Sequence, residues 1–248
     1  MSILTTRNHV NQGRIGIIAG AGPEAGIDLW QKILSANKSQ MGGQFRGDLD
    51  APDVTVFSIP RLGLAMNLAE NEEALWSELK SAAQALAQRT DYICIACNVL
   101  HYFSDRIREL NLAAELVSVV DVAAAYIQSQ QLEKFALVSI QAVTILDKWS
   151  PYRVLGRYGD IEVPAQPTKV NDLVADIKRF GAGHPYARAA FKSILDSLGS
   201  EVVFLACTEL PLVKIEIGGK GLVDVTELLA QEVVRKSLSG RAEYQAAT

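Results

Sequence analysis

Two short apolar segments that end in the same way constrain the fold of this 248-residue chain more than any other feature. Residues 92–97 and 202–207 are continuous apolar runs, and each leads into Ala-Cys and a small polar residue at 96–98 and 206–208. Continuous apolar runs of this length are typical of strands buried on both faces of a parallel sheet. The two cysteines are 110 residues apart, which predicts two similar halves, each presenting a thiol at an equivalent point.

Further apolar runs alternate with segments of helical periodicity along the chain. We expect strands at 14–20, 54–59, 92–97, 116–120, 135–140, 162–163 and 202–207. We expect helices at about 23–35, 73–88, 122–131, 145–158, 170–180, 185–198 and 226–237. This alternation predicts an α/β fold with mostly parallel sheets flanked by helices, and binding sites in such folds lie at the carboxyl ends of strands.

Charge and cysteine content narrow the class of protein. The net charge is −4 with no basic run, so no nucleic-acid partner is expected. Three cysteines give no disulfide framework and fit a reducing compartment. Residues 1–13 form a loose polar leader without the apolar core of a signal peptide, and no apolar run is long enough to span a membrane. These features predict a soluble, cytoplasmic protein with no membrane partner.

The cysteines admit a structural and a chemical interpretation. A single cysteine at the end of an apolar strand is usually buried packing, but two in matching positions favour chemistry. Cys94 falls within the strand and on the opposite face from Cys97, so it is expected to be structural. The Cys94-to-Cys97 spacing lacks the helix start that a redox motif needs, and no second pair has zinc-ligand spacing. We therefore expect neither redox chemistry nor a metal.

Two facing thiols can invert a stereocentre without a cofactor. One thiolate removes a proton from carbon while the opposite thiol delivers one to the other face. Donors such as Asn98, Thr208 and backbone N–H groups would stabilise the developing charge. The glycine-rich loop at 20–26 lacks both the dinucleotide-binding and the P-loop patterns, which leaves a tight turn or an anion-cradling loop.

Three segments, in order, resemble those of aspartate racemases. Residues 17–25 (IIAGAGPEA) resemble the GGMGPEAT loop that opens these enzymes, residues 96–103 (ACNVLHYF) resemble CNTAHxF, and residues 206–212 (ACTELPL) resemble GCTELPLL. The chain is thereby identified as a member of the aspartate/glutamate racemase superfamily. The resemblance implies a PLP-independent two-base racemase or epimerase whose small-molecule substrate is an amino acid, commonly as a homodimer.

The resemblance also implies an arrangement of lobes and residues. The first lobe would comprise 14–115 plus 220–248 and carry Cys97, the second would comprise 116–219 and carry Cys207, and the site would lie in the cleft between these pseudo-symmetric lobes. By this resemblance, Cys97 and Cys207 correspond to the two catalytic cysteines of the family. The substrate-binding residues expected by the same resemblance are Gly22, Arg61, Asn98, Val99, Thr144, Lys178, Thr208 and Glu209.

Departures from the family pattern concern the substrate side chain. Val99 replaces a threonine, and the arginine that binds the distal carboxylate of aspartate aligns near Ala65, with Arg61 four residues away. In the second lobe only Thr144 remains of a T-x-G-T loop. Aspartate, glutamate or a related amino acid is the expected substrate, with Arg61 and Lys178 replacing the missing charge. Maleate isomerase, hydantoin racemase, arylmalonate decarboxylase and a non-enzymatic ligand-binding role remain as alternatives.

Overall fold

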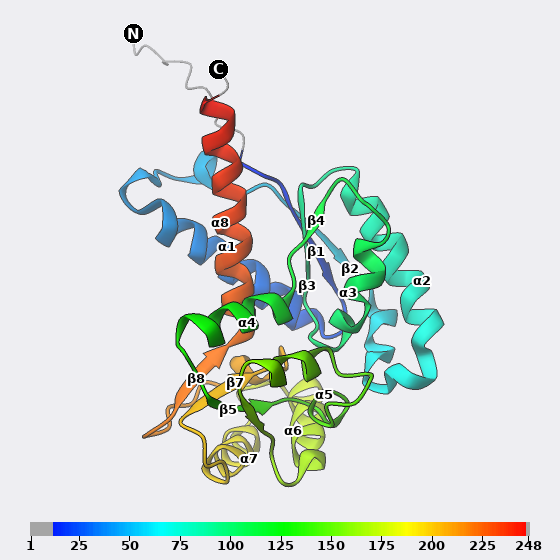
Figure 1. The fold of residues 1–248 in the computed structure, drawn as a ribbon, viewed down its shortest axis with the longest axis vertical. Helices are drawn as coiled ribbons and strands as arrows, with labels where there is room; N and C mark the ends of the chain where they lie inside the picture. Colours follow the sequence, from blue (N-terminus) through cyan, green and yellow to red (C-terminus); the bar gives the residue numbers. More distant parts are fainter. Residues whose placement is uncertain (1–11, 247–248) are drawn as a thin grey trace.

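The strands form two separate four-stranded sheets in a computed structural model that describes residues 12–246, with side chains from 12 to 239 (Figure 1). The strand orders are β2-β1-β3-β4 and β6-β5-β7-β8, and every pairing is parallel. The two orders are the same when each half is numbered from its own first strand. The expected α/β class, with two mostly parallel sheets flanked by helices, is confirmed.

The first sheet lies between helices that come from both ends of the chain. Its strands are β1 (Ile15–Ala19), β2 (Val54–Ser58), β3 (Tyr92–Ile95) and β4 (Glu115–Leu116). Its helices are α1 (Pro23–Met41), α2 (Leu68–Ala87, kinked at Asn71) and α3 (Ser104–Arg108). Short 3₁₀ turns occupy Gly42–Gln44, Asp48–Asp50, Pro60–Asn67 (η3) and Val99–Phe103 (η4). β1 is buried along its whole length because strands flank it on both sides and helices cover it.

The second sheet has the same plan with different helices. Its strands are β5 (Lys134–Val138), β6 (Asp160–Glu162), β7 (Val202–Leu205) and β8 (Gly221–Asp224). The other elements are α4 (Val119–Ser129), α5 (Gln141–Thr144), η5 (Pro151–Arg157), α6 (Pro167–Phe180), α7 (Pro185–Asp196), η6 (Leu210–Leu212) and α8 (Val225–Ala246). From the second sheet, α8 returns along α1 of the first half (Figure 1).

Two expected elements are wrong. The α-helix expected over 145–158 is absent: α5 ends at Thr144, before the expected start, and 151–157 forms a 3₁₀ helix. Two local features prevent a continuous helix there: Leu146 has a left-handed φ of +57°, and Pro151 disfavours a helical conformation at Ser150, which is extended. The strand expected over 116–120 ends at Leu116, because Ser118 caps α4 by accepting a hydrogen bond from the backbone N–H of Val120 at 3.2 Å.

Strand β8 was not expected, and it alters the division into halves. It pairs with β7, so residues 221–224 belong to the second sheet. The expected division placed residues 220–248 in the first lobe. The expected boundary at 115/116 also falls inside β4, which pairs with β3. Of the predicted leader, residues 1–11 lie outside the described part. Gly13 donates a backbone hydrogen bond to Ser237 of α8 at 3.1 Å.

A half-buried ion pair joins the two halves. Lys32 of α1 lies 2.6 Å from Asp224 at the end of β8 and also contacts Asp28 one turn earlier. The side chains of Lys32 and Asp224 are 12% and 22% exposed, so water screens this pair less than a surface pair. No helix in the described part of the chain is both long and apolar enough to cross a membrane.

Candidate active site

Cys97 and Cys207 follow corresponding strands of the two sheets. Each is the second residue after the last residue of its strand, β3 for Cys97 and β7 for Cys207. The N–H of the alanine before each cysteine bonds to the neighbouring strand, at 2.8 Å to the carbonyl of Ile18 and 2.9 Å to that of Val138. The repeated Ala-Cys pattern of the sequence therefore corresponds to a repeated backbone geometry.

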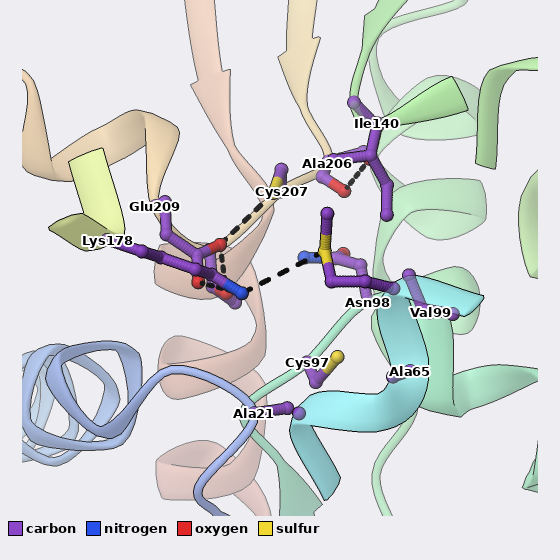
Figure 2. A pocket seen from close by; sticks show the side chains of 14 residues that line it. Ala21, Ala65, Cys97, Asn98, Val99, Ile140, Lys178, Ala206, Cys207 and Glu209 are labelled. Atoms are coloured by element: carbon purple, nitrogen blue, oxygen red, sulfur yellow. Dashed lines mark hydrogen bonds and ion pairs between the residues drawn. The ribbon is translucent and has the colours of Figure 1, made fainter. Parts of the chain in front are cut away.

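Both thiols line one cavity, to which we refer as the thiol cavity. Cys97 is 9% exposed and Cys207 is 8% exposed, so both are nearly enclosed. In Figure 2 the two side chains lie on opposite sides of the view, with Lys178 and Glu209 on a third side. The lining residues are Ala21, Gly63, Ala65, Met66, Cys97, Asn98, Val99, Ser139, Ile140, Lys178, Ala206, Cys207, Thr208 and Glu209.

The thiol of Cys207 donates a hydrogen bond to a carboxylate. Its Sγ lies 3.1 Å from Glu209 Oε2, and both residues lie in the turn that follows β7 (Figure 2). Burial raises the pKa of Cys207 well above its usual value, and the negative charge of Glu209 raises it further. This environment holds Cys207 in its protonated form, which is the form of an acid.

Cys97 sits instead at the start of the 3₁₀ turn η4. Burial raises the pKa of Cys97 to about 11 and the charge of Glu209 adds to the rise, while backbone N–H groups of Leu100 and Val99 and the charge of Lys178 oppose it. N–H groups at the start of a helical turn stabilise a thiolate. Cys97 is therefore easier to deprotonate than Cys207.

Lys178 and Glu209 form an ion pair at the edge of the thiol cavity. Lys178 Nζ lies 3.2 Å from Glu209 Oε1, and the side chains are 31% and 6% exposed. Burial lowers the pKa of Lys178, but the neighbouring carboxylate of Glu209 outweighs this and leaves the pKa raised. Thr208 Oγ1 also donates to Glu209 Oε2 at 3.1 Å. The carboxylate thus organises a lysine, a threonine and a thiol at once.

The glycine-rich loop after β1 packs against that same carboxylate. Gly22 has a φ of +97°, and a Cβ at this position would lie 2.5 Å from Glu209 Oε1. Gly20 has a φ of +112°, and its Cβ would lie 2.3 Å from the carbonyl oxygen of Ile59. Only glycine fits these two positions without strain. Gly22 therefore lies against Glu209, and its neighbour Ala21 lines the cavity.

Asn98 is held by a residue that the sequence analysis missed. Tyr152, which is fully buried in η5, donates a hydrogen bond from its hydroxyl to Asn98 Oδ1. Because Oδ1 is the acceptor, the amide Nδ2 is left as a buried donor, and it has no hydrogen-bond partner among the described residues. Burial raises the pKa of Tyr152, and the nearby charges of Cys207 and Cys97 add to the effect. The hydroxyl therefore stays protonated beside both cysteines.

Three residues of the expected set do not line the thiol cavity: Gly22, which lies behind Glu209, Arg61 and Thr144. Arg61 is 73% exposed and forms an ion pair with Glu78 of α2 at 3.3 Å, because the η3 turn directs its side chain outwards. Thr144 is buried, and its hydroxyl bonds back to the carbonyl of Ile140 at 3.4 Å. Ala65, near which the family arginine aligns, does line the cavity. Arg61 therefore lies outside the thiol cavity in this structure, and its expected contact with the substrate stays a prediction.

The residues that could bind a metal are dispersed. Within the described residues, no three His, Cys, Asp or Glu side chains come together in a way that could hold a metal ion. Cys94, the third thiol, is fully buried inside β3 and takes no part in the cavity.

Comparisons with known proteins agree with this architecture. Residues 18–233 match the model of the Asp/Glu/Hydantoin racemase family. An aspartate racemase homologue from Pyrococcus horikoshii superposes with a TM-score of 0.71 at 23% identity, covering 91% of this chain and 99% of its own. An aspartate racemase from Picrophilus torridus gives 0.76 at 21% identity, covering 91% and 94%. A glutamate racemase from Thermus thermophilus, in complex with β-chloro-D-alanine, gives 0.61 at 20%, covering 93% and 82%. None of the curated proteins matches the sequence significantly.

The fold and the family model together identify the class of protein. The α/β fold of two parallel sheets is shared with aspartate and glutamate racemases, and the match of residues 18–233 to a racemase family model makes the chain a racemase-type isomerase. The family match spans most of the sequence, so the chain belongs to the Asp/Glu/Hydantoin racemase family. The expected membership and the expected enzyme class are confirmed.

Proposed function

We propose that the protein inverts the α-carbon of a free amino acid by two-base proton transfer between Cys97 and Cys207, without a cofactor. The observation that carries this proposal is that two thiols from corresponding strand ends of the two sheets line a single cavity. A substrate between them would present one face of its α-carbon to each sulfur.

The unequal environments of the thiols suggest their starting roles. The Cys97 thiolate removes the α-proton from one face, and the thiol of Cys207, which is bonded to Glu209, gives its proton to the other face. The products are the inverted amino acid, a Cys97 thiol and a Cys207 thiolate. The reverse reaction uses the same residues with exchanged roles, so protons balance in both directions.

The negative charge that develops on the α-carboxylate needs donors in place before the reaction. Asn98 Nδ2 is a buried donor at the cavity, and the hydroxyl of Tyr152 fixes its orientation. Lys178 adds positive charge, and the proposed contacts also include Thr208 and Glu209. Val99 would contribute only an apolar surface. Gly22 would act indirectly, through its close approach to Glu209.

The family resemblance extends the proposal to assembly and location. We expect a homodimer in the cytoplasm, with the two sheets and their helices as two lobes around the thiol cavity. Light scattering after gel filtration measures the assembly, and fractionation of cells that produce the protein measures the location. A monomer would leave the chemistry of the thiol cavity as proposed, because every residue invoked above lies in one chain.

A direct assay tests the reaction. The protein is incubated with a panel of L-amino acids in D₂O, without PLP and with a metal chelator present. Loss of the Cα–H signal by NMR and appearance of the D-enantiomer by chiral chromatography are expected for at least one amino acid. If no amino acid exchanges its Cα–H, or if activity requires PLP or a metal, the proposal is wrong.

A further inference from the structure

The charges in the thiol cavity are balanced before any substrate enters. Of the fourteen lining residues, Lys178 and Glu209 alone carry a full charge, and they are paired at 3.2 Å. The Glu209 side chain is 6% exposed, so water does little to screen it. The local charge of the cavity is therefore close to zero when both thiols are protonated, and it is negative when Cys97 is a thiolate.

The alternative cation expected from the sequence, Arg61, points away from the cavity. Arg61 is 73% exposed and pairs with Glu78 on α2, outside the lining of the cavity. The cavity wall close to it in sequence is made of Gly63, Ala65 and Met66, none of which carries a charge. Ala65 is 3% exposed, so its methyl group forms part of a closed, apolar surface.

The apolar wall continues around the other side of the cavity. Val99 and Ile140 line it together with Ala21, and Figure 2 shows Val99, Ile140 and Ala65 on the side of the view opposite Lys178. A free amino acid already carries an α-carboxylate and an α-ammonium group. The pair of Lys178 and Glu209 offers one opposite charge to each of them.

We infer that the substrate is an amino acid with a small, uncharged side chain rather than aspartate or glutamate. This inference rests on the proposed function and specifies the substrate class of the same site. The α-carboxylate binds toward Lys178 and Asn98, the α-ammonium group binds toward Glu209, and the side chain lies against the apolar wall. A second carboxylate would be buried without a cation of its own, which is strongly unfavourable.

Isosteric substrates isolate charge from size. We compare kcat/KM for asparagine with aspartate and for glutamine with glutamate, alongside alanine, serine and phenylalanine. We expect kcat/KM for each amide to exceed that for its acid by about tenfold or more. We expect kcat/KM for the best small neutral amino acid to exceed the values for aspartate and glutamate by a similar factor. The inference is overturned if aspartate or glutamate is used as well as, or better than, its amide and the small neutral amino acids. Failure to exchange the Cα–H of any amino acid refutes the proposed function itself, which is a distinct outcome.

Charge variants test the same point within one protein. Glu209→Gln leaves Lys178 unpaired, so the ratio of kcat/KM for aspartate over asparagine should rise about tenfold. The ratio cancels any general loss of activity caused by the altered contact with Cys207. Glu216→Gln, at an exposed acidic position outside the lining of the thiol cavity, is the matched control and should leave the ratio unchanged.

Arg61→Ala distinguishes the competing assignment. If Arg61 bound a substrate carboxylate, its loss would selectively lower kcat/KM for aspartate, and that result would overturn the inference. The expected result is an unchanged ratio of aspartate to asparagine. Should Glu209→Gln fail to fold, the wild-type ratios for the two isosteric pairs still decide the question.

Discussion

The two cysteines occupy matching positions in the two halves, yet their surroundings differ. They are almost equally buried, at 9% and 8% exposure, and each follows the third strand of its half. The residue two positions after Cys97 is Val99, whereas the residue two positions after Cys207 is Glu209. Cys207 consequently donates to a carboxylate at 3.1 Å, and Cys97 faces backbone N–H groups without such a partner.

This difference shows how a repeated fold can serve a reaction that needs an acid and a base at the same time. The repeat places two thiols at equivalent strand ends. The residue two positions after each thiol differs, Val99 in one half and Glu209 in the other, and this difference gives the thiols unequal pKa values. A nearby anion favours the protonated thiol, and N–H donors favour the thiolate. The following variants test whether placement and asymmetry are both required.

Removal of either thiol should have the largest effect. Cys97→Ala or Cys207→Ala leaves one face of the substrate without a proton donor or acceptor, so kcat for racemisation should fall by about 10³-fold or more. Chiral chromatography measures the activity, and circular dichroism checks the fold. Cys94→Ala is the matched control and should retain most of the activity, because this thiol lies inside β3 and away from the thiol cavity. Near-normal racemisation by either of the first two variants would contradict the two-base assignment.

Glu209→Gln should reduce the asymmetry between the thiols. Because the carboxylate raises the pKa of Cys207, its removal should lower that pKa and increase the thiolate fraction at a given pH. We expect alkylation of Cys207 at pH 8 to become about tenfold faster, which corresponds to about one pKa unit. Iodoacetamide labelling read by mass spectrometry reports each cysteine separately. A larger acceleration at Cys97 than at Cys207 would show that Glu209 does not set the difference.

Tyr152→Phe should weaken the proposed contact between Asn98 Nδ2 and the substrate, because Tyr152 of the second half orients Asn98 of the first. The variant removes the hydroxyl that orients Asn98, so kcat/KM should fall by about three- to tenfold, the range of a lost hydrogen bond. A positioning role predicts that the pH profile keeps its shape while KM rises. Tyr102→Phe, which loses a bond to Glu72 outside the thiol cavity, is the control and should match the wild type in KM. Equal KM values for both variants and the wild type would remove Tyr152 from the account.

Arg61→Ala should have the smallest effect. Its exposed pair with Glu78 contributes about 0–1 kcal/mol to the free energy of unfolding. Thermal unfolding and kcat/KM for the best substrate should both stay close to wild type. A loss of activity above about tenfold would place Arg61 in contact with the substrate and would favour an acidic substrate.

Much of the fold could be predicted because apolar runs and alternation are local properties. The strands around both cysteines and the parallel class followed from such runs. The helix expected over 145–158 is absent, since the left-handed conformation of Leu146 and the effect of Pro151 on Ser150 interrupt an otherwise helical pattern. Strand β8 was missed because Gly221–Asp224 is short and becomes a strand only by pairing with β7.

The site could be predicted in part for a related reason. A local pattern located Cys97, Cys207 and their neighbours, and the structure brings them together. Tyr152 carries no local signal, because its role depends on a hydrogen bond to a residue 54 positions away. The direction of the Arg61 side chain depends on the η3 turn and on Glu78, neither of which a linear pattern reveals.

The most direct test of two thiols acting from opposite faces is the isotope pattern of the first turnovers in D₂O. Each enantiomer of the best substrate is incubated separately, and the product and the recovered substrate are analysed by chiral chromatography with mass spectrometry. We expect the product to carry deuterium at the α-carbon while the recovered substrate retains hydrogen, from both starting enantiomers. A product that retains the hydrogen of the substrate, or a recovered substrate that gains deuterium as fast as the product forms, would show that a single group handles both protons.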